Sequence, residues 1–300
     1  GDHRDLHLSI RRQRQMCIRD SLYREERSQA RNSNQIESLE DLPIKKAVIN
    51  EDGSSQDLDI VKLRLIIDEA CSGVEDVSAD DVFELIDKNI YDGIKKEDLS
   101  SSILISIRPL IEKDPNYSYV VARLLLSSLY EEGLTFLNFK NNTPTIKEMS
   151  KLYPEYFKAY IKEAVDLELI DKELLNYDME FIAKNIDPTK DLAFTYLGLQ
   201  TLYDRYFIHE QGKRFELPQA FFMRVAMGLA INEENREERT IEFYNLISSF
   251  DFMCSTPTLF NSGTLRPQLS SCYLSTLPDD LKGIFAVSYT HLTLPTNREV

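Results

Sequence analysis

Apolar residues recur at helical spacing along most of this chain, and strand-like segments are short. Ala47–Asn50 is a short apolar strand candidate, and the Asp52-Gly53 pair that follows it is typical of a hairpin turn. Turns interrupt the apolar stripes that follow, which predicts four short antiparallel helices packed with the hairpin in one domain, residues 47–133. These helices are predicted from Val61 to near Gly73, from Ser78 to Ile90, from Leu99 to just before Pro115, and from Tyr117 to near Gly133.

The helical pattern continues from Ile146 to Phe250 and predicts a second domain, residues 146–250. Phe136–Thr145 carries Asn141, Asn142 and Pro144, and is predicted to link the two domains. Only Phe250–Ser255 and Ser271–Ser275 resemble strands after this point. The predicted fold class is therefore mainly α with a small β component. The helices of the second domain are predicted at 154–168, 178–185, 190–207, 218–230 and 234–250.

The two ends of the chain are related by a repeat in the nucleotides and not in the protein. Met16–Ser21 can be encoded ATG TGT ATA AGA GAC AGC, whose reverse complement reads Ala-Val-Ser-Tyr-Thr-His, the sequence of Ala286–His291. The complement continues outward, where Arg11–Gln15 maps onto Leu292–Thr296. A linker or sequencing adapter ligated at both ends leaves such a repeat, and it is excluded from fold reasoning. The predicted segments are 1–21 and 287–300 as non-native adapter-derived sequence, and 22–46 as a polar linker or extension.

Composition narrows the possible functions. The formal net charge of −15 argues against nucleic-acid binding as the main role, and no apolar run approaches the ~20 residues of a membrane span. Once the adapter-derived ends are set aside, the cysteines are Cys71, Cys254 and Cys272, and the histidine is His209. Three unevenly spaced cysteines make neither a disulfide framework nor a Cys/His metal site. This pattern predicts a cytoplasmic protein with no metal of its own.

The segment Ser255–Cys272 carries the clearest candidate chemistry. It is rich in hydroxyls, is bent by prolines and a glycine, and ends in a thiol. Such a turn can direct N–H groups and hydroxyls at a phosphate, and the same composition is also found in ordinary loops. Cys272 is either a redox thiol at a strand mouth or a small packed side chain, as most free cysteines are. Cys71 and Cys254 are predicted to be structural, and Asp279 either caps a helix or binds a sugar hydroxyl.

Several sequence blocks together resemble one enzyme family. Asn261-Ser262-Gly263-Thr264, followed by Arg266-Pro267-Gln268-Leu269-Ser270-Ser271-Cys272, closely matches the signature of the ribonucleotide reductase large (catalytic, alpha) subunit. The resemblance extends from Ala47 to Phe285, and its layout is similar to that of the class I enzymes. The upstream blocks that resemble the family are Glu216 to Gln219, Phe222 to Ala230 and Asp191 to Gly198 in its helical domain, and Tyr91 to Ile94, Asp114 to Tyr117 and Ala122 to Leu124 in its ATP-cone.

This resemblance implies a domain order and a reaction. Residues 47–133 would be an ATP-cone-like domain, and residues 146–250 the helical N-terminal domain of the reductase. Residues 251–285 would hold the first strands of a ten-stranded α/β barrel, truncated in this chain. The family is an oxidoreductase that reduces the ribose 2′-hydroxyl of ribonucleotides by a radical and redox-thiol mechanism. It thereby supplies deoxyribonucleotides for DNA replication.

The resemblance also implies roles for individual residues. Cys272 falls on the redox-active cysteine, which supplies reducing equivalents and ends turnover disulfide-bonded to a cysteine on a later strand. Thr258 and Ser271 fall on substrate-contacting positions. Asp279 falls on the aspartate that holds the ribose of a specificity effector, and Lys62 falls on a nucleotide-binding position of the cone.

The implied partners follow from the same family. The substrates are ribonucleoside diphosphates, and ATP and deoxynucleotides are allosteric effectors. No cofactor is expected to bind this segment directly, because a metal-containing small (beta) subunit generates the radical. Thioredoxin or glutaredoxin would reduce the disulfide, and the full-length enzyme would be a homodimer. Two alternatives stay open: a cobalamin-dependent (class II) reductase, which shares the Ser-Ser-Cys loop, and a non-catalytic helical nucleotide-sensing module.

The sequence departs from the family pattern in the cone. Asn50 and Glu51 replace a Lys-Arg pair, Lys96 stands where a threonine is expected, and Glu131 replaces a helical lysine, while Lys62 is retained. Losing cations and adding carboxylates weakens attraction for a triphosphate. We expect the cone to keep its fold without its nucleotide site. The remaining catalytic residues of the family should follow Phe285, so the segment alone is expected to show no turnover.

Overall fold

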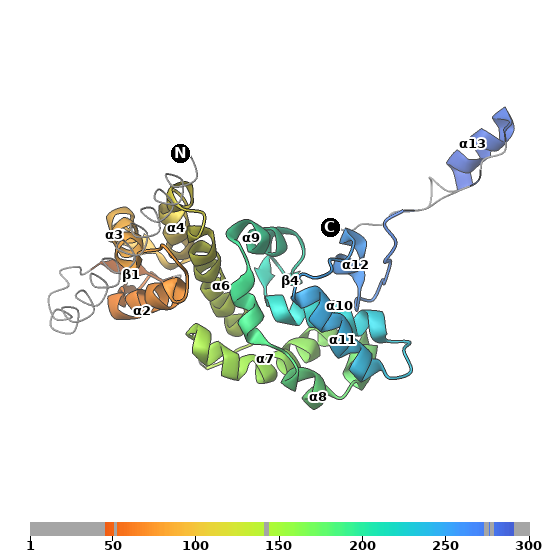
Figure 1. Ribbon diagram of the computed structural model, residues 1–300, viewed down its shortest axis with the longest axis horizontal. Helices are drawn as coiled ribbons and strands as arrows, with labels where there is room; N and C mark the ends of the chain where they lie inside the picture. The colour runs from red at the N-terminus through yellow and green to blue at the C-terminus, as the bar shows by residue number, and fades with distance from the viewer. Residues whose placement is uncertain (1–45, 51–52, 141–143, 273–275, 277–278, 291–300) are drawn as a thin grey trace, which may run out of the picture. The chain divides into compact units, whose positions relative to one another are not determined.

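The computed structural model describes residues 46–50, 53–140, 144–272, 276 and 279–290 (Figure 1). Within these residues the chain is mainly helical and contains two small sheets, which confirms the predicted fold class. The chain divides into two compact units. One contains the residues up to Ile60 together with Tyr91–Lys95, and the other contains Val61–Ile90 and the residues from Lys96 onward.

The first unit is built on a three-stranded sheet in the order β2-β1-β3. Its strands are β1 (Ala47–Ile49), β2 (Ser55–Asp57) and β3 (Ile94–Lys95). The antiparallel pairing of β1 with β2 confirms the predicted hairpin, whereas the parallel pairing of β1 with β3 was not foreseen. The carboxylate of Asp92 accepts a 2.7 Å hydrogen bond from the Ala47 amide and so ties the two distant segments of the sheet together.

The second unit begins with helices close to the predicted ones. Ser78 caps the second of them, accepting a hydrogen bond from the Asp81 amide as their spacing indicates. The predicted stop at Gly133 is wrong, because the last of these helices continues to Phe136. A Cβ added at Gly133 would make ordinary van der Waals contact, 3.6 Å from the Phe215 backbone, so the glycine lies against the core inside the helix. The helices are α2 (Ile60–Cys71), α3 (Ala79–Asn89), α4 (Lys96–Ile107), α5 (Leu110–Lys113) and α6 (Tyr117–Phe136).

The helix predicted to begin at Pro154 begins earlier. A capping box between Thr145 and Glu148 starts α7 (Ile146–Asp166), and Pro154 lies inside it. A proline costs the helix one backbone hydrogen bond and normally disfavours the interior. Here seven buried side chains on α7 hold the helix against the core through that point.

The remaining elements correct two further predictions. The helix predicted at 190–207 is divided at Phe194 and Thr195 into a 3₁₀ turn and a helix, and Phe250–Ser255 forms no strand. Most of Ser271–Ser275 lies outside the described residues. The other elements are η1 (Lys172–Asn176), α8 (Met179–Lys184), η2 (Pro188–Ala193), α9 (Tyr196–Arg205), β4 (His209–Glu210), β5 (Lys213–Arg214), α10 (Pro218–Ala230), α11 (Arg236–Ser248), α12 (Thr256–Asn261) and α13 (Leu281–Thr290).

Helix α10 lies at the centre of the second unit. Eleven of its 13 residues are buried, which is typical of a helix that is surrounded on all sides. It lies alongside α11 (Figure 1) and also contacts η2 and α12. Buried residues of α6, α7 and α9 belong to the same hydrophobic core. Among the described residues, none of the helices combines the length and the apolar character needed to cross a membrane.

Candidate functional site

The segment Ser255–Cys272 folds as a short helix, α12, followed by an irregular stretch, residues 265–272, that is hydrogen-bonded back to the helix. Pro257 lies in the first turn of α12, where a proline loses no helical hydrogen bond. The Thr258 hydroxyl donates to the Leu269 carbonyl at 3.1 Å, and the Asn261 side-chain amide donates to the Gln268 carbonyl at 2.7 Å. These two bonds join α12 to residues 268–269, directly before Ser271 and Cys272. The Thr258 hydroxyl is thus used in the folding of the segment itself.

The turn after α12 packs directly on the backbone of α10. Gly263 has a φ of +76°, which an L side chain rarely adopts. A Cβ added to Gly228 would lie 2.7 Å from the Gly263 Cα and still closer to its nitrogen, so both glycines are needed for this approach. The Ser262 hydroxyl donates to the Val225 carbonyl at 2.8 Å, and the Gly263 carbonyl accepts from the Asp171 amide at 2.9 Å.

A fully buried ion pair lies beside this turn. Arg224 donates through Nε to Glu216 Oε1 at 2.6 Å and through Nη2 to Glu216 Oε2 at 3.2 Å. Its Nη1 donates to the Ser262 carbonyl at 2.6 Å, and Nη2 also reaches the Leu259 carbonyl at 3.4 Å. Burial opposes the positive charge, but the attraction of Glu216 outweighs it and leaves the pKa of Arg224 raised. The guanidinium therefore connects α10 to the last turn of α12.

Glu216 is itself held by donors from two other elements. Its Oε1 accepts from the Tyr160 hydroxyl at 2.5 Å, and its Oε2 accepts from the Ile208 amide at 2.8 Å. Together with the two bonds from Arg224, the carboxylate is saturated with donors although it has no exposure to solvent. A buried carboxylate is stable only when it is paired and hydrogen-bonded in this way.

A second buried carboxylate, Asp191, lies in η2. Its Oδ2 accepts from the hydroxyls of Tyr130 at 2.8 Å and Tyr153 at 3.2 Å, and its Oδ1 accepts from Gln219 Nε2 at 2.8 Å. Its contacts provide no cation, and burial raises the pKa of Asp191 to about 7 against the three hydrogen bonds, which lower it. Asp191 therefore caps no helix, whereas Asp187 caps η2 by accepting from the Thr189 amide.

The structure places the predicted site residues on separate elements. Thr258 is half-buried in α12. Ser271 and Cys272 are exposed at the end of the irregular stretch that follows α12, and the Ser271 hydroxyl lies 3.8 Å from the Cys272 sulfur. Lys62 lies on α2, and Asp279 lies exposed before α13. It is the neighbouring Asp280 that caps α13, because its carboxylate accepts from the Gly283 amide at 2.7 Å.

The three cysteines differ in their surroundings. Cys71 is half-buried at the end of α2, and burial raises the pKa of its thiol to about 11. Cys254 packs at the edge of the hydrophobic core, and burial likewise raises its pKa. These surroundings confirm the structural interpretation of both, because a neutral buried thiol is a weak nucleophile. Cys272 is an exposed free thiol in the part of the chain that the structure describes.

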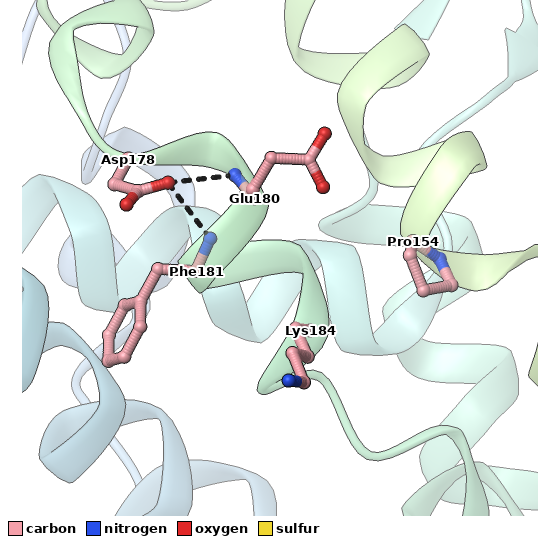
Figure 2. Close-up of a pocket in the computed structure, with 5 residues that line it drawn as sticks. All are labelled: Pro154, Asp178, Glu180, Phe181 and Lys184. Atoms are coloured by element: carbon pink, nitrogen blue, oxygen red, sulfur yellow. Dashed lines mark hydrogen bonds between the residues drawn. The ribbon is translucent and has the colours of Figure 1, made fainter.

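The structure has a surface hollow between α7 and α8, but this hollow does not offer a second functional site. Figure 2 shows an open hollow between α7 and α8, lined by residues that include Pro154, Phe181 and Lys184. Both of its acidic residues have structural partners: Asp178 caps α8, and Glu180 forms a 2.6 Å ion pair with Lys158. None of the predicted site residues lines it. Within the described ranges, no group of three or more His, Cys, Asp or Glu side chains is arranged to hold a metal ion.

The sequence patterns assign no role to the buried ion pair of Arg224 and Glu216. Arg224 lies in a run of apolar residues, and a charge at such a position is rarely buried unless it is paired. That signal indicates a paired arginine, but it does not identify Glu216 or the Leu259 and Ser262 carbonyls as partners. The two glycines, Gly228 and Gly263, carried no comparable signal.

Comparison with known proteins supports the family resemblance. Residues 192–267 match the family described as ribonucleotide reductase, all-alpha domain. A ribonucleoside-diphosphate reductase subunit alpha of Chlamydia muridarum is 40% identical over 272 residues, which cover 89% of this chain and 25% of that protein. The corresponding subunit of Helicobacter pylori is 34% identical over 82% of this chain and 30% of its own length. A large subunit of Danio rerio is 29% identical over 79% of this chain.

The matched family region covers the later helices of the second unit. It includes α9 to α12, the Glu216–Arg224 pair and the Gly263 turn. The chain spans about a quarter of the length of the first two chlamydial relatives. The resemblance read from the sequence is thus confirmed, and the chain is a segment related to ribonucleotide reductase large (alpha) subunits that carries their all-alpha domain.

Proposed function

We propose that this chain is part of a ribonucleoside-diphosphate reductase large subunit, an enzyme that makes deoxyribonucleotides from ribonucleotides. The observation that carries the proposal is the exposed free thiol of Cys272, at the end of a segment bonded to α12 and, through α12, to the core. An exposed thiol can exchange with other thiols and disulfides, which a packed one cannot do. The relatives with this name match 79–89% of the chain.

In the proposed reaction, Cys272 and a second cysteine outside this segment together give up two hydrogens. The C2′–OH bond of the ribose is replaced by a C2′–H bond, the hydroxyl leaves as water, and the two sulfurs form a disulfide. Thr258 and Ser271 would hold the substrate beside the thiol. The Ser271 hydroxyl is exposed, and Thr258 donates to Leu269 while its oxygen retains acceptor capacity.

The finer assignments belong to the same proposal. Asp279 would hold the ribose of an effector nucleotide, since it is exposed and the capping role falls to Asp280. Residues 251–285 would begin the α/β barrel. The partners would be a radical-generating small subunit, thioredoxin or glutaredoxin, and a second large subunit. This chain alone would have no turnover, because the second cysteine of the proposed pair lies outside it.

A second candidate is a helical module that senses nucleotides without catalysis. This function fits the helical fold, but it assigns no role to the exposed thiol of Cys272 at the end of the segment Ser255–Cys272. In a cobalamin-dependent reductase the same loop would operate with a different radical source.

Cys272→Ser is the test of the proposed function. In the full-length parent enzyme we expect this variant to lose turnover to background, because a hydroxyl can form no disulfide. Cys254→Ser is the matched control and should keep activity within about twofold, since Cys254 is a packing residue at the core edge. Ribonucleotide reduction in the presence of the small subunit is the measurement. Normal turnover of Cys272→Ser would contradict the proposal.

We further propose that the cone has lost its nucleotide site. Lys96 on α4 and Glu131 on α6 occupy two of the positions where the sequence departs from the family pattern. They form an ion pair in which Lys96 Nζ lies 3.4 Å from Glu131 Oε1. The lysine is therefore partly neutralised instead of being available to a phosphate. Lys62 remains the cation that the resemblance assigns to the cone.

Calorimetric titration of the 300-residue chain with ATP and dATP tests this loss. We expect no binding in the micromolar range, because the carboxylate of Glu131 lies where a cation is expected. The double variant Lys96→Thr/Glu131→Lys restores the family residues at two of the four departures and should bind more tightly than the parent chain. Micromolar affinity of the unmodified chain would contradict the proposal. The complete chain is used because buried residues of α6 belong to the core of the later helices.

A further inference from the structure

We infer that Arg224 is a positioning residue for the segment Ser255–Cys272, here called the redox loop. Its guanidinium, oriented by Glu216, sets the position of α12 and thereby of Thr258 and Cys272. The inference rests on the proposed function only for what the loop does. The positioning itself is a property of the fold. Arg224 lies on α10 and would touch neither the substrate nor the reacting sulfur.

The first step is the orientation of the guanidinium. Glu216 engages Nε and Nη2, the two nitrogens on one edge of the fork, at 2.6 and 3.2 Å. Tyr160 and the Ile208 amide bind the same carboxylate and keep it from rotating. A planar fork held along one edge has its remaining donors aimed in a fixed direction. In this protein they point at the end of α12.

The second step is the contact with α12. Nη1 donates to the Ser262 carbonyl at 2.6 Å and Nη2 to the Leu259 carbonyl at 3.4 Å, both near the end of this six-residue helix. Carbonyls in the last turn of a helix have no partner within the helix, so a buried one requires another donor. A helix as short as α12 is unstable alone, and its place therefore depends on such anchors.

The third step leads from α12 to the thiol. Asn261 is the last residue of α12 and holds the Gln268 carbonyl, while Thr258, one turn earlier, holds the Leu269 carbonyl. These bonds hold Gln268 and Leu269, which lie three to four residues before Cys272, against α12. A displacement of α12 therefore moves Thr258 and Cys272 together.

Two substitutions of Arg224 separate positioning from simple charge balance. Arg224→Lys keeps a cation opposite Glu216 but lacks the fork, and Arg224→Met lacks both. If Arg224 positions the loop, both variants should release α12. If it only neutralises Glu216, Arg224→Lys should behave like the parent chain.

Hydrogen exchange of the 300-residue chain is the first measurement. In the parent chain the amides of Leu259 and Ser262 donate within α12. We expect both to exchange at least tenfold faster in Arg224→Lys, while the amides of α7 keep the parent rate. Parent-like exchange in α12 would overturn the inference, and so would equal acceleration in α7, because that would show a general loss of stability. Arg236→Lys is the matched control, since Arg236 also donates to a backbone carbonyl, that of Asn176, away from the loop.

Asn261→Ala keeps the inference testable if neither Arg224 variant folds. This half-exposed side chain can be removed without opening the core. We expect exchange of the Gln268 amide to accelerate at least tenfold, while that of Leu259, which Arg224 anchors, stays within about twofold. Simultaneous release of Leu259, or no change at Gln268, would overturn the proposed order of contacts.

Turnover of the full-length enzyme is the second measurement. Arg224→Lys should lower kcat at least tenfold, with native circular dichroism and parent-like exchange in α7. Unchanged kcat with a released α12 would overturn the link to the thiol. Loss of kcat in Arg224→Lys with normal turnover of Cys272→Ser would instead contradict the proposed function, so the two failures are distinguishable.

Discussion

Replacing Gly228 by alanine is expected to destabilise the protein by about 3 kcal/mol or more, at the upper end of the range for overpacked cores. The added Cβ would lie 2.5 Å from the Ser262 hydroxyl oxygen and 2.7 Å from the Gly263 Cα. Relief requires a backbone shift, because the nearest atoms belong to the Gly263 main chain. That shift would separate α10 from the turn and strain the bonds from Arg224 and Asp171 to it.

Gly198→Ala is the matched control for this prediction. Gly198 is an exposed helical glycine in α9, where a Cβ would lie 3.4 Å from the Thr195 hydroxyl oxygen. Alanine should therefore stabilise the helix by about 0.5–1 kcal/mol through its higher helix propensity. Urea unfolding of the 300-residue chain measures both variants. Equal effects of the two substitutions would show that α10 and the Gly263 turn do not pack as described.

Asp191→Asn is expected to remove a large pH dependence of stability. Burial raises the pKa of Asp191 from 3.8 to about 7, so the folded protein holds this proton more tightly than the unfolded chain. The contribution of Asp191 to the free energy of unfolding is therefore complete below pH 3.8. It is lost as the pH rises through about 7. Each pKa unit corresponds to about 1.4 kcal/mol, which gives a loss of about 4 kcal/mol over this window.

An asparagine can replace the carboxylate without its charge. Its oxygen can accept from Gln219, and its amide can donate to the oxygens of Tyr130 and Tyr153. The difference in unfolding free energy, variant minus parent, should therefore increase from pH 5 to pH 8 and then level off. Tyr130→Phe removes a donor that lowers the pKa of Asp191 and should move this window to higher pH. Parallel pH profiles of Asp191→Asn and the parent chain would contradict the assignment.

Local signals were sufficient for several elements of the fold. Helix α10 has the bounds Pro218–Ala230 that its apolar run and first-turn proline predict. The Ser78 cap likewise starts α3 where its sequence indicates. Signals of this kind depend on a few neighbouring residues, so they survive without knowledge of the tertiary structure. The chemistry of Ser255–Cys272 and the family resemblance were also available at this level.

Errors arose where packing overrides a local preference. Pro154 is typical of a helix start, but the capping box at Thr145 begins α7 earlier and the core holds the helix past the proline. Gly133 is typical of a helix stop, but α6 continues past it to Phe136. Phe250–Ser255 has apolar residues typical of a strand, and no partner strand pairs with it among the described residues. Strands depend on distant partners, which local patterns do not reveal.

The amino-acid sequence determined the helical fold class, the helix at the centre of the second unit and the thiol as the candidate redox group. The tertiary structure alone decided which polar residues are buried and what they hold. The carboxyl group of Asp191 is enclosed by two tyrosines and a glutamine from other elements. Arg224 reaches Ser262 across 38 residues of sequence. Periodicity and capping act over one or two helical turns, whereas a buried ion pair exists only after separate helices have packed together.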